Sequence, residues 1–105
     1  MHGPGYSGAN DLTSSYTLAS GQSFSDRFHT FAVDWTPTSV SYLVDGQIYE
    51  TQTPNTTRGA PWVFRHPFSL ILNLAVGGSW PGSPDAQTVF PATMLVDYVA
   101  VYQKT

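Results

Sequence analysis

The alternation of apolar and polar positions along the chain predicts β-strands and no long helix. Residues 28–35 alternate between two faces, one carrying aromatic and branched side chains, which is typical of a strand. Residues 40–44 and 47–51 have similar content and flank the dipeptide Asp45-Gly46. Asp-Gly between two such runs indicates a β-hairpin with a type I′ turn, because both central residues of that turn need a positive φ.

Two further runs extend the predicted sheet structure. Residues 68–76 are apolar except for Ser69 and Asn73, which predicts a strand with both faces covered, in the middle of a sheet. Residues 94–102 predict a last strand that carries Asp97. Since no segment shows a sustained apolar stripe at helical spacing, the pattern predicts an all-β antiparallel sandwich, or part of one.

The pattern also predicts the domain organisation. We expect a single partial β-sandwich domain over residues 1–105, with a loop-rich segment at 1–27 and strands over 28–105. A long loop is predicted at 77–91, directly after the most buried strand. A loop of this length in a compact domain is usually functional or disordered. Trp80 favours a functional loop, and a structural cover for the sheet edge is the alternative.

Composition and charge exclude several classes of protein. The chain is 41% hydrophobic and 14% aromatic, but only 10% of its residues are charged, against about 25% in an average domain. It has 4 basic and 7 acidic residues and a net charge of −3, with no basic cluster, so we expect neither nucleic acid nor a membrane surface as a partner. No apolar run is long enough to span a bilayer, and no secretory leader is present in these 105 residues. The absence of cysteine excludes disulfides and Cys-ligated zinc.

The residues show no local catalytic centre. The chain has one glutamate and six aspartates, and no two of these acids lie within four positions of each other. We assign Asp45 to the hairpin turn and Glu50 to the exposed end of the hairpin. A pair assembled from distant segments, with Asp34 or Glu50 among its members, stays open. The three histidines, His2, His29 and His66, share no metal-ligand spacing. His29, on the first strand, is predicted to be buried with its hydrogen bonds satisfied.

Five runs together resemble the C-terminal half of a laminarinase of glycoside hydrolase family sixteen, in one register over essentially the whole chain. They are HGPGYSG (residues 2–8), FHTFAVDWTP (28–37), YLVDG (42–46), PFSLILNLAVGGSWPG (67–82) and MLVDYVAVYQ (94–103). The resemblance implies a jelly-roll, a concanavalin-like sandwich of two antiparallel sheets whose curved inner sheet forms a cleft for β-glucan.

The resemblance also implies where catalysis would reside. In that family the catalysts lie on one strand as Glu-x-Asp-x-x-Glu, and period-two alternation points all three acids into the cleft. The first Glu is the nucleophile and the second the acid/base of a retaining mechanism. The motif does not occur in these 105 residues. We therefore expect an incomplete half of a jelly-roll that belongs to a retaining endo-β-1,3-glucanase, is not catalytic alone, and contains no catalytic residue.

Several positions match binding residues of the family. The segment from His2 to Tyr6 resembles the loop beside the sugar subsites. Asn73 is expected to face the cleft and bind a sugar hydroxyl, and pairing with a polar neighbour inside the sandwich is the alternative. Trp80 resembles a tryptophan that flanks the cleft and stacks on a pyranose. Asp97 resembles a ligand of a structural calcium ion, with a simple hydrogen-bonded aspartate as the alternative. No cofactor is expected for catalysis.

The resemblance implies partners and location as well. β-Glucan polysaccharide is the expected ligand, and the protein is expected to be extracellular. Half of a jelly-roll leaves strand edges unpaired, which favours self-association or pairing with a complementary N-terminal half. A non-catalytic β-glucan-binding, lectin-like sandwich is the alternative function. A carboxylate pair in the cleft would separate the enzyme from the binding module.

Overall fold

The computed structural model describes residues 1–104 and shows two compact units, Met1–Phe68 and residues 69–104. All regular secondary structure of the described residues lies in the first unit. Its elements are three strands and two short 3-10 helices: η1 (Gly8–Asn10), β1 (Phe31–Thr36), β2 (Ser39–Val44), β3 (Gln47–Gln52) and η2 (Pro54–Thr57). In the described part of the chain, no helix is long and apolar enough to cross a membrane.

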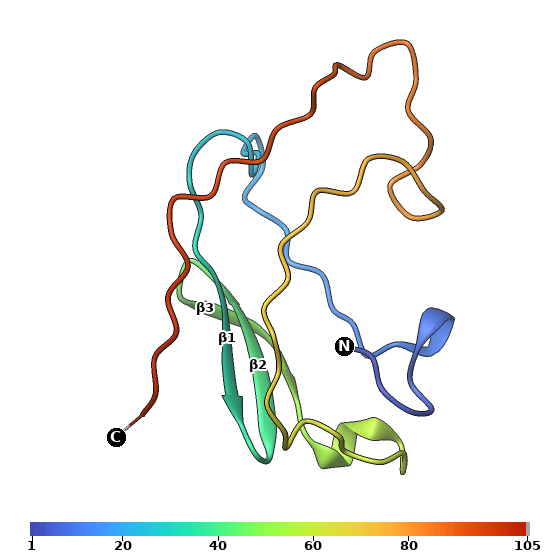
Figure 1. Ribbon diagram of the computed structural model, residues 1–105, viewed down its shortest axis with the longest axis vertical. Helices are drawn as coiled ribbons and strands as arrows, with labels where there is room; N and C mark the ends of the chain where they lie inside the picture. Colours follow the sequence, from blue (N-terminus) through green and yellow to red (C-terminus); the bar gives the residue numbers. More distant parts are fainter. Residues whose placement is uncertain (105) are drawn as a thin grey trace. The chain divides into compact units, whose positions relative to one another are not determined.

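The three strands form one antiparallel sheet in the order β1-β2-β3 (Figure 1). The predicted hairpin is confirmed: β2 and β3 are joined by Asp45 and Gly46, whose φ angles are 49° and 79°. Both are positive, as a type I′ turn requires. The strand predicted at 28–35 begins three residues later than expected, at Phe31. Residues 28–30 are not part of the ladder of hydrogen bonds that pairs β1 with β2.

One face of the sheet carries the apolar side chains of the first two strands. In the register of β1 and β2, Val33 lies opposite Tyr42 and Trp35 lies opposite Val40. A β-bulge between Tyr42 and Leu43 interrupts the pairing of β2 with β3. The buried core of the described residues is small, since only four hydrophobic side chains are fully enclosed: Tyr6, Leu12, Val40 and Val44.

The second short helix, η2, follows β3 in the first unit. Thr53 caps η2, since its backbone N–H donates to Oγ1 of Thr56 at 3.0 Å. The hydroxyl of Thr57, a residue that is 2% exposed, has the carbonyl oxygens of Pro54 and Ala60 at 2.9 and 2.6 Å as the acceptors for its one proton. This arrangement turns the chain towards the segment that packs against Tyr6.

The two strands predicted at 68–76 and 94–102 are not formed in the structure. Both stretches lack ladder hydrogen bonds, and their apolar side chains are exposed, Ile71 at 83% and Val101 at 87%. A strand predicted for the middle of a sheet needs a neighbour on each side, and no strand within residues 1–104 pairs with either stretch. The regular structure of the described residues is therefore one three-stranded sheet, and their fold is mostly β without an α-helix.

Candidate functional site

The loop that begins the chain is anchored by a buried tyrosine. Gly3 and Tyr6 form an isolated antiparallel bridge, with both backbone N–H···O distances at 3.0 Å. The Tyr6 side chain is 2% exposed, and its hydroxyl donates to the carbonyl oxygen of Pro61 at 3.0 Å. Tyr6 was predicted to bind substrate, but in this structure its ring supports the loop from inside the first unit.

His2, the other residue predicted in this loop, is exposed. Its Nε2 lies 4.0 Å from Oδ2 of Asp11, and the two side chains are 63% and 28% exposed. An ion pair in this setting, which exists only when the histidine is protonated, contributes little to stability because water screens it. The imidazole is therefore accessible to a ligand on the same surface.

The loop at 77–91 presents the most exposed large hydrophobic side chain of the described residues. Trp80 is 96% exposed. It lies in a turn closed by the backbone hydrogen bond from Gly82 N to the Gly78 carbonyl, at 3.0 Å, and both glycines have positive φ, 84° and 129°. A side chain would strain the backbone at both positions, so the glycines allow the turn that exposes the indole.

The same loop contains a second ordered turn, around Asp85. The Asp85 carboxylate accepts a hydrogen bond from the Gln87 backbone N–H at 2.9 Å and one from the Thr88 hydroxyl at 3.2 Å. These bonds lower the pKa of Asp85 below its usual value, the Gln87 N–H contributing most. The loop is thus held by local hydrogen bonds on both sides of Pro84.

Asn73 and Asp97 both lie in the second unit and are exposed. His2 and Tyr6 belong to the first unit, so the predicted site residues are divided between the two. Within residues 1–104, no group of three His, Cys, Asp or Glu side chains could hold a metal ion. Calcium takes six to eight oxygen ligands, of which Asp97 offers one carboxylate.

The sheet register shows how the two strand carboxylates, Asp34 and Glu50, are placed relative to each other. Asp34 lies opposite Ser41, and Glu50 lies opposite Tyr42. Because successive residues of a strand point to opposite faces, Ser41 and Tyr42 project to different sides, and so do the two acids beside them. Asp34 and Glu50 therefore do not form a catalytic pair across this sheet.

Glu50 was expected at an exposed hairpin end, and this prediction is wrong. Its side chain is enclosed, at 9% exposure. Oε2 accepts a hydrogen bond from the Ser14 backbone N–H at 3.0 Å, and Oε1 accepts one from Nε2 of Gln52 at 2.6 Å. Burial raises the pKa of Tyr42 above its usual value, and the nearby Glu50 carboxylate raises it further. Glu50 thus joins the segment before Tyr16 to β3.

The turn residue Asp45 has a second role that the sequence did not suggest. Its carboxylate accepts from the Thr30 backbone N–H at 3.0 Å and lies 2.7 Å from Nδ1 of His29 and 3.1 Å from Nη2 of Arg27. These groups hold the pKa of Asp45 below its usual value, the Thr30 N–H first. His29 is buried as predicted, its side chain 2% exposed, but its Nε2 is enclosed without a hydrogen-bond partner in the described residues.

The strand register makes some of these contacts predictable from the sequence. Regular alternation from the Asp45-Gly46 turn would place Glu50 opposite Ser41, on the other face from Val40 and Val44. The β-bulge between Tyr42 and Leu43 instead places Glu50 opposite Tyr42, on the face of the two valines, and nothing in the sequence indicated the bulge. Extending β1 backwards places Arg27 and His29 beside the turn. The hydrogen bonds of Ser14 to Glu50 and of Tyr6 to Pro61 could not be predicted in this way, because loop residues have no strand register that would fix their neighbours.

Comparison with known proteins places the chain in a family. The sequence model of the family described as "Glycosyl hydrolases family 16" matches residues 1–100. The chain belongs to glycosyl hydrolase family 16. The structure of an endo-β-1,3-glucanase from Pyrococcus furiosus superposes on 86% of the chain with a TM-score of 0.81 and 49% identity. The catalytic domain of an endo-1,3-β-glucanase (laminarinase) from Thermotoga petrophila RKU-1 covers 85% of the chain, with a TM-score of 0.79 and 48% identity.

A curated relative is also similar to most of the chain. Glucan endo-1,3-beta-glucosidase A1 of Niallia circulans is 41% identical over 100 residues, which are 85% of this chain. The matched region is 14% of that relative, 35% of the Pyrococcus structure and 36% of the Thermotoga structure. This family 16 chain therefore corresponds to a fraction of the catalytic domain of its relatives.

Proposed function

We propose that the chain is the β-glucan-binding portion of a retaining endo-β-1,3-glucanase and corresponds to the C-terminal half of that domain. The observation that carries the proposal is the match to the Pyrococcus endo-β-1,3-glucanase, which combines close structural similarity with nearly half of the residues identical over most of the chain. Identity at this level, spread over one register, supports a shared ligand as well as a shared fold.

In this proposal Trp80 is the main binding residue. Its indole is almost fully exposed on a turn ordered by Gly78 and Gly82. An aromatic face of this kind stacks on the C–H face of a pyranose, and burial of the ring supplies the binding energy. Asn73, an exposed residue of the same unit as Trp80, supplies a hydrogen bond to a sugar hydroxyl, and His2 offers an exposed imidazole for the same purpose on the first unit. Tyr6 acts through the loop that it anchors and positions His2 without contacting sugar.

Hydrolysis in this proposal needs carboxylates other than those of the 105 residues. A retaining glycosidase uses two carboxyl groups about 5 to 5.5 Å apart, one as nucleophile and one as acid/base. Asp34 and Glu50 lie on opposite faces of the sheet, and Asp45 is engaged by Thr30, His29 and Arg27. The chain therefore binds β-glucan and does not cleave it alone.

The test measures laminarin binding and hydrolysis with the purified 105-residue chain. We expect saturable binding in calorimetry and no increase in reducing ends. Trp80→Ala is expected to weaken binding by about tenfold or more, which is the loss of one stacked aromatic anchor. Tyr102→Ala is the matched control, since Tyr102 is also an exposed aromatic residue of the second unit, at 88%.

Two outcomes would contradict the proposal. Equal loss of binding in Trp80→Ala and Tyr102→Ala would show that Trp80 is no specific anchor. Reducing ends that persist through repurification would show that the 105 residues hold a working carboxylate pair. Binding that remains non-hydrolytic when a complementary catalytic half is added would favour the lectin-like alternative.

Calcium and location are further parts of the proposal. Asp97 would supply one of the six to eight oxygens that calcium requires, and Asp97→Asn is expected to abolish calcium binding in calorimetry. Calcium binding that is unchanged in this variant would remove Asp97 from the site. The proposal also includes an extracellular location, where a protein would meet glucan polymers outside the cell, and fractionation of the source cells tests it.

A further inference from the structure

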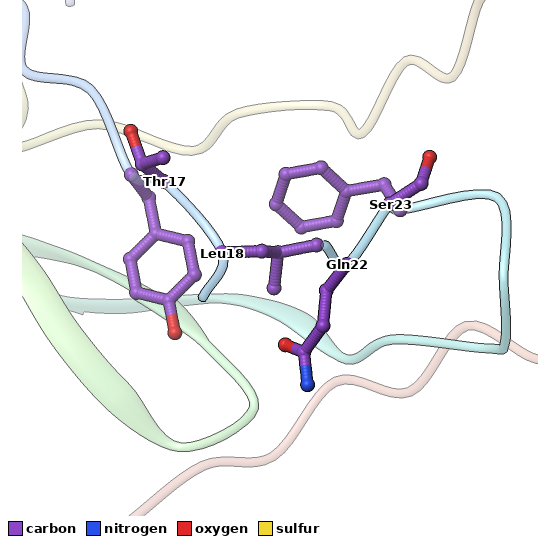
Figure 2. Close-up of a pocket in the computed structure, with 6 residues that line it drawn as sticks. Thr17, Leu18, Gln22 and Ser23 are labelled. Atoms are coloured by element: carbon purple, nitrogen blue, oxygen red, sulfur yellow. The ribbon is translucent and has the colours of Figure 1, made fainter. Parts of the chain in front are cut away.

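A surface hollow of the first unit is lined by none of the residues discussed above as glucan-binding candidates. Its volume is about 290 Å³. Figure 2 shows that its walls come from two arms of the loop-rich segment, with Thr17 and Leu18 on one arm and Gln22 and Ser23 on the other. The lining is completed by two aromatic side chains, Tyr16 and Phe24.

The two aromatic rings are held in place by the sheet. The centroids of Tyr16 and Phe24 are 6.4 Å apart, and the ring planes meet at 49°. Tyr49 of β3 contacts Tyr16 at 5.7 Å, and Phe31 of β1 contacts Phe24 at 5.5 Å. The rings are therefore positioned before any ligand binds, which reduces the side-chain entropy that is lost on binding. Phe24 is still 41% exposed, so ring surface is available.

The polar groups of the hollow are also positioned by backbone hydrogen bonds. The Gln22 backbone N–H donates to the Ala19 carbonyl at 3.1 Å, closing a turn in which Gly21 has a φ of 83°. The Ser23 backbone N–H donates to Oδ2 of Asp26 at 2.8 Å. The Ser23 hydroxyl already contacts that of Ser25 at 2.8 Å, so the exposed Gln22 amide is the principal donor and acceptor for a ligand.

The composition of the lining selects the class of ligand. None of its six residues is charged, so an ionic ligand would lose its hydration without gaining a counter-charge. Aromatic faces beside an amide and a hydroxyl suit a ring with apolar C–H faces and hydroxyl edges. The volume lies at the lower end of the roughly 300 to 1,000 Å³ of ligand pockets, which limits the ligand to one such ring.

We propose that the hollow formed by residues 16–18 and 22–24 binds a single neutral pyranose ring. Phe24 and Tyr16 supply the stacking faces, and Gln22 supplies the hydrogen bonds. This inference does not depend on the function proposed for Trp80, because the residues of the hollow are all in the first unit and Trp80 is in the second.

The experiment titrates the 105-residue chain with methyl β-D-glucopyranoside and follows backbone and side-chain amide shifts by NMR. We expect saturable shifts at residues 16–24, including the Gln22 side-chain NH₂, with a dissociation constant in the millimolar range. Gln22→Ala is expected to weaken this binding about three- to tenfold, the usual effect of one hydrogen bond. Phe24→Leu, which keeps apolar bulk and loses the flat face, is expected to weaken it by a similar factor.

The controls keep the two binding proposals separate. Gln47→Ala changes an exposed glutamine of β3 outside the hollow and is expected to leave the titration unchanged. Trp80→Ala is expected to reduce laminarin binding and leave the glucoside shifts at residues 16–24 intact. No saturable shift in this segment, or equal binding in Gln22→Ala and the unmodified chain, would overturn the inference whatever the outcome with laminarin.

Discussion

Nδ1 of His29 lies 2.7 Å from Oδ2 of Asp45, and this contact joins the residues before β1 to the turn after β2. The turn also donates its own Asp45 backbone N–H to the Thr30 carbonyl at 2.9 Å. One residue therefore sets the hairpin turn through its positive φ and fixes the neighbouring strand through its carboxylate. This double role makes Asp45 the most informative position for testing the stability of the sheet.

The first prediction concerns acid sensitivity. The folded-state pKa of Asp45 is lowered, chiefly by the Thr30 N–H, so its contribution to stability is complete above the unfolded value of about 3.9 and is lost as pH falls through the folded pKa. The melting temperature is expected to fall below about pH 4. Asp45→Asn should flatten this part of the profile, as thermal melts between pH 2 and 7 will show.

Asp34→Asn provides the control for this experiment, since Asp34 is an exposed aspartate of β1 with no role in the turn. It should retain the acid-induced fall. If the profiles of Asp45→Asn and the unmodified chain coincide, the carboxylate contacts of Asp45 do not stabilise the folded state.

The second prediction concerns the buried carboxylate. Glu50→Ala leaves the Ser14 N–H and the Gln52 amide without their acceptor. An unsatisfied buried donor costs about 1 to 3 kcal/mol of unfolding free energy, and we expect a loss in this range by urea denaturation. Gln47→Ala, on the exposed part of the same strand, is expected to change stability by less than about 0.5 kcal/mol. Equal midpoints for the two variants would contradict the burial of Glu50.

The third prediction separates the hydroxyl of Tyr6 from its ring. Tyr6→Phe removes the hydrogen bond to the Pro61 carbonyl and keeps the ring packed 6.4 Å from Phe64, so we expect a loss of about 0.5 to 1.5 kcal/mol. Tyr6→Ala also removes the ring and is expected to cost about 3 to 5 kcal/mol. Tyr102→Phe is the control, because Tyr102 is 88% exposed. A Tyr6→Phe chain as stable as that control would show that the Pro61 contact is not stabilising.

The fourth prediction concerns association. The apolar side chains of residues 68–76 and 94–102 are exposed, and neither stretch has a ladder partner within residues 1–104. Exposed apolar segments without paired backbone groups favour association, so we expect the isolated chain to sediment as an oligomer. Ile71→Lys together with Val99→Lys should shift it towards the monomer. A monomer with a cooperative thermal transition in the unmodified chain would rule this out.

The strand and turn at Asp45-Gly46 were predictable because their causes are local. Two adjacent residues that accept positive φ, between runs of β-forming residues, determine a hairpin without help from the rest of the chain. Family membership was predictable for a related reason, since five runs in a single register identify it and the comparisons confirm it.

Other features depended on residues far apart in the sequence. Residues 68–76 have the composition of a central strand, but a strand exists only when neighbours accept its hydrogen bonds. Ser14 determines the setting of Glu50, and Pro61 that of Tyr6; the first pair is 36 positions apart and the second 55. The sequence by itself determined the hairpin, the β character and the family. Only the tertiary structure decided which polar groups are enclosed and which apolar runs are paired, because burial and ladder hydrogen bonds are properties of neighbours in space.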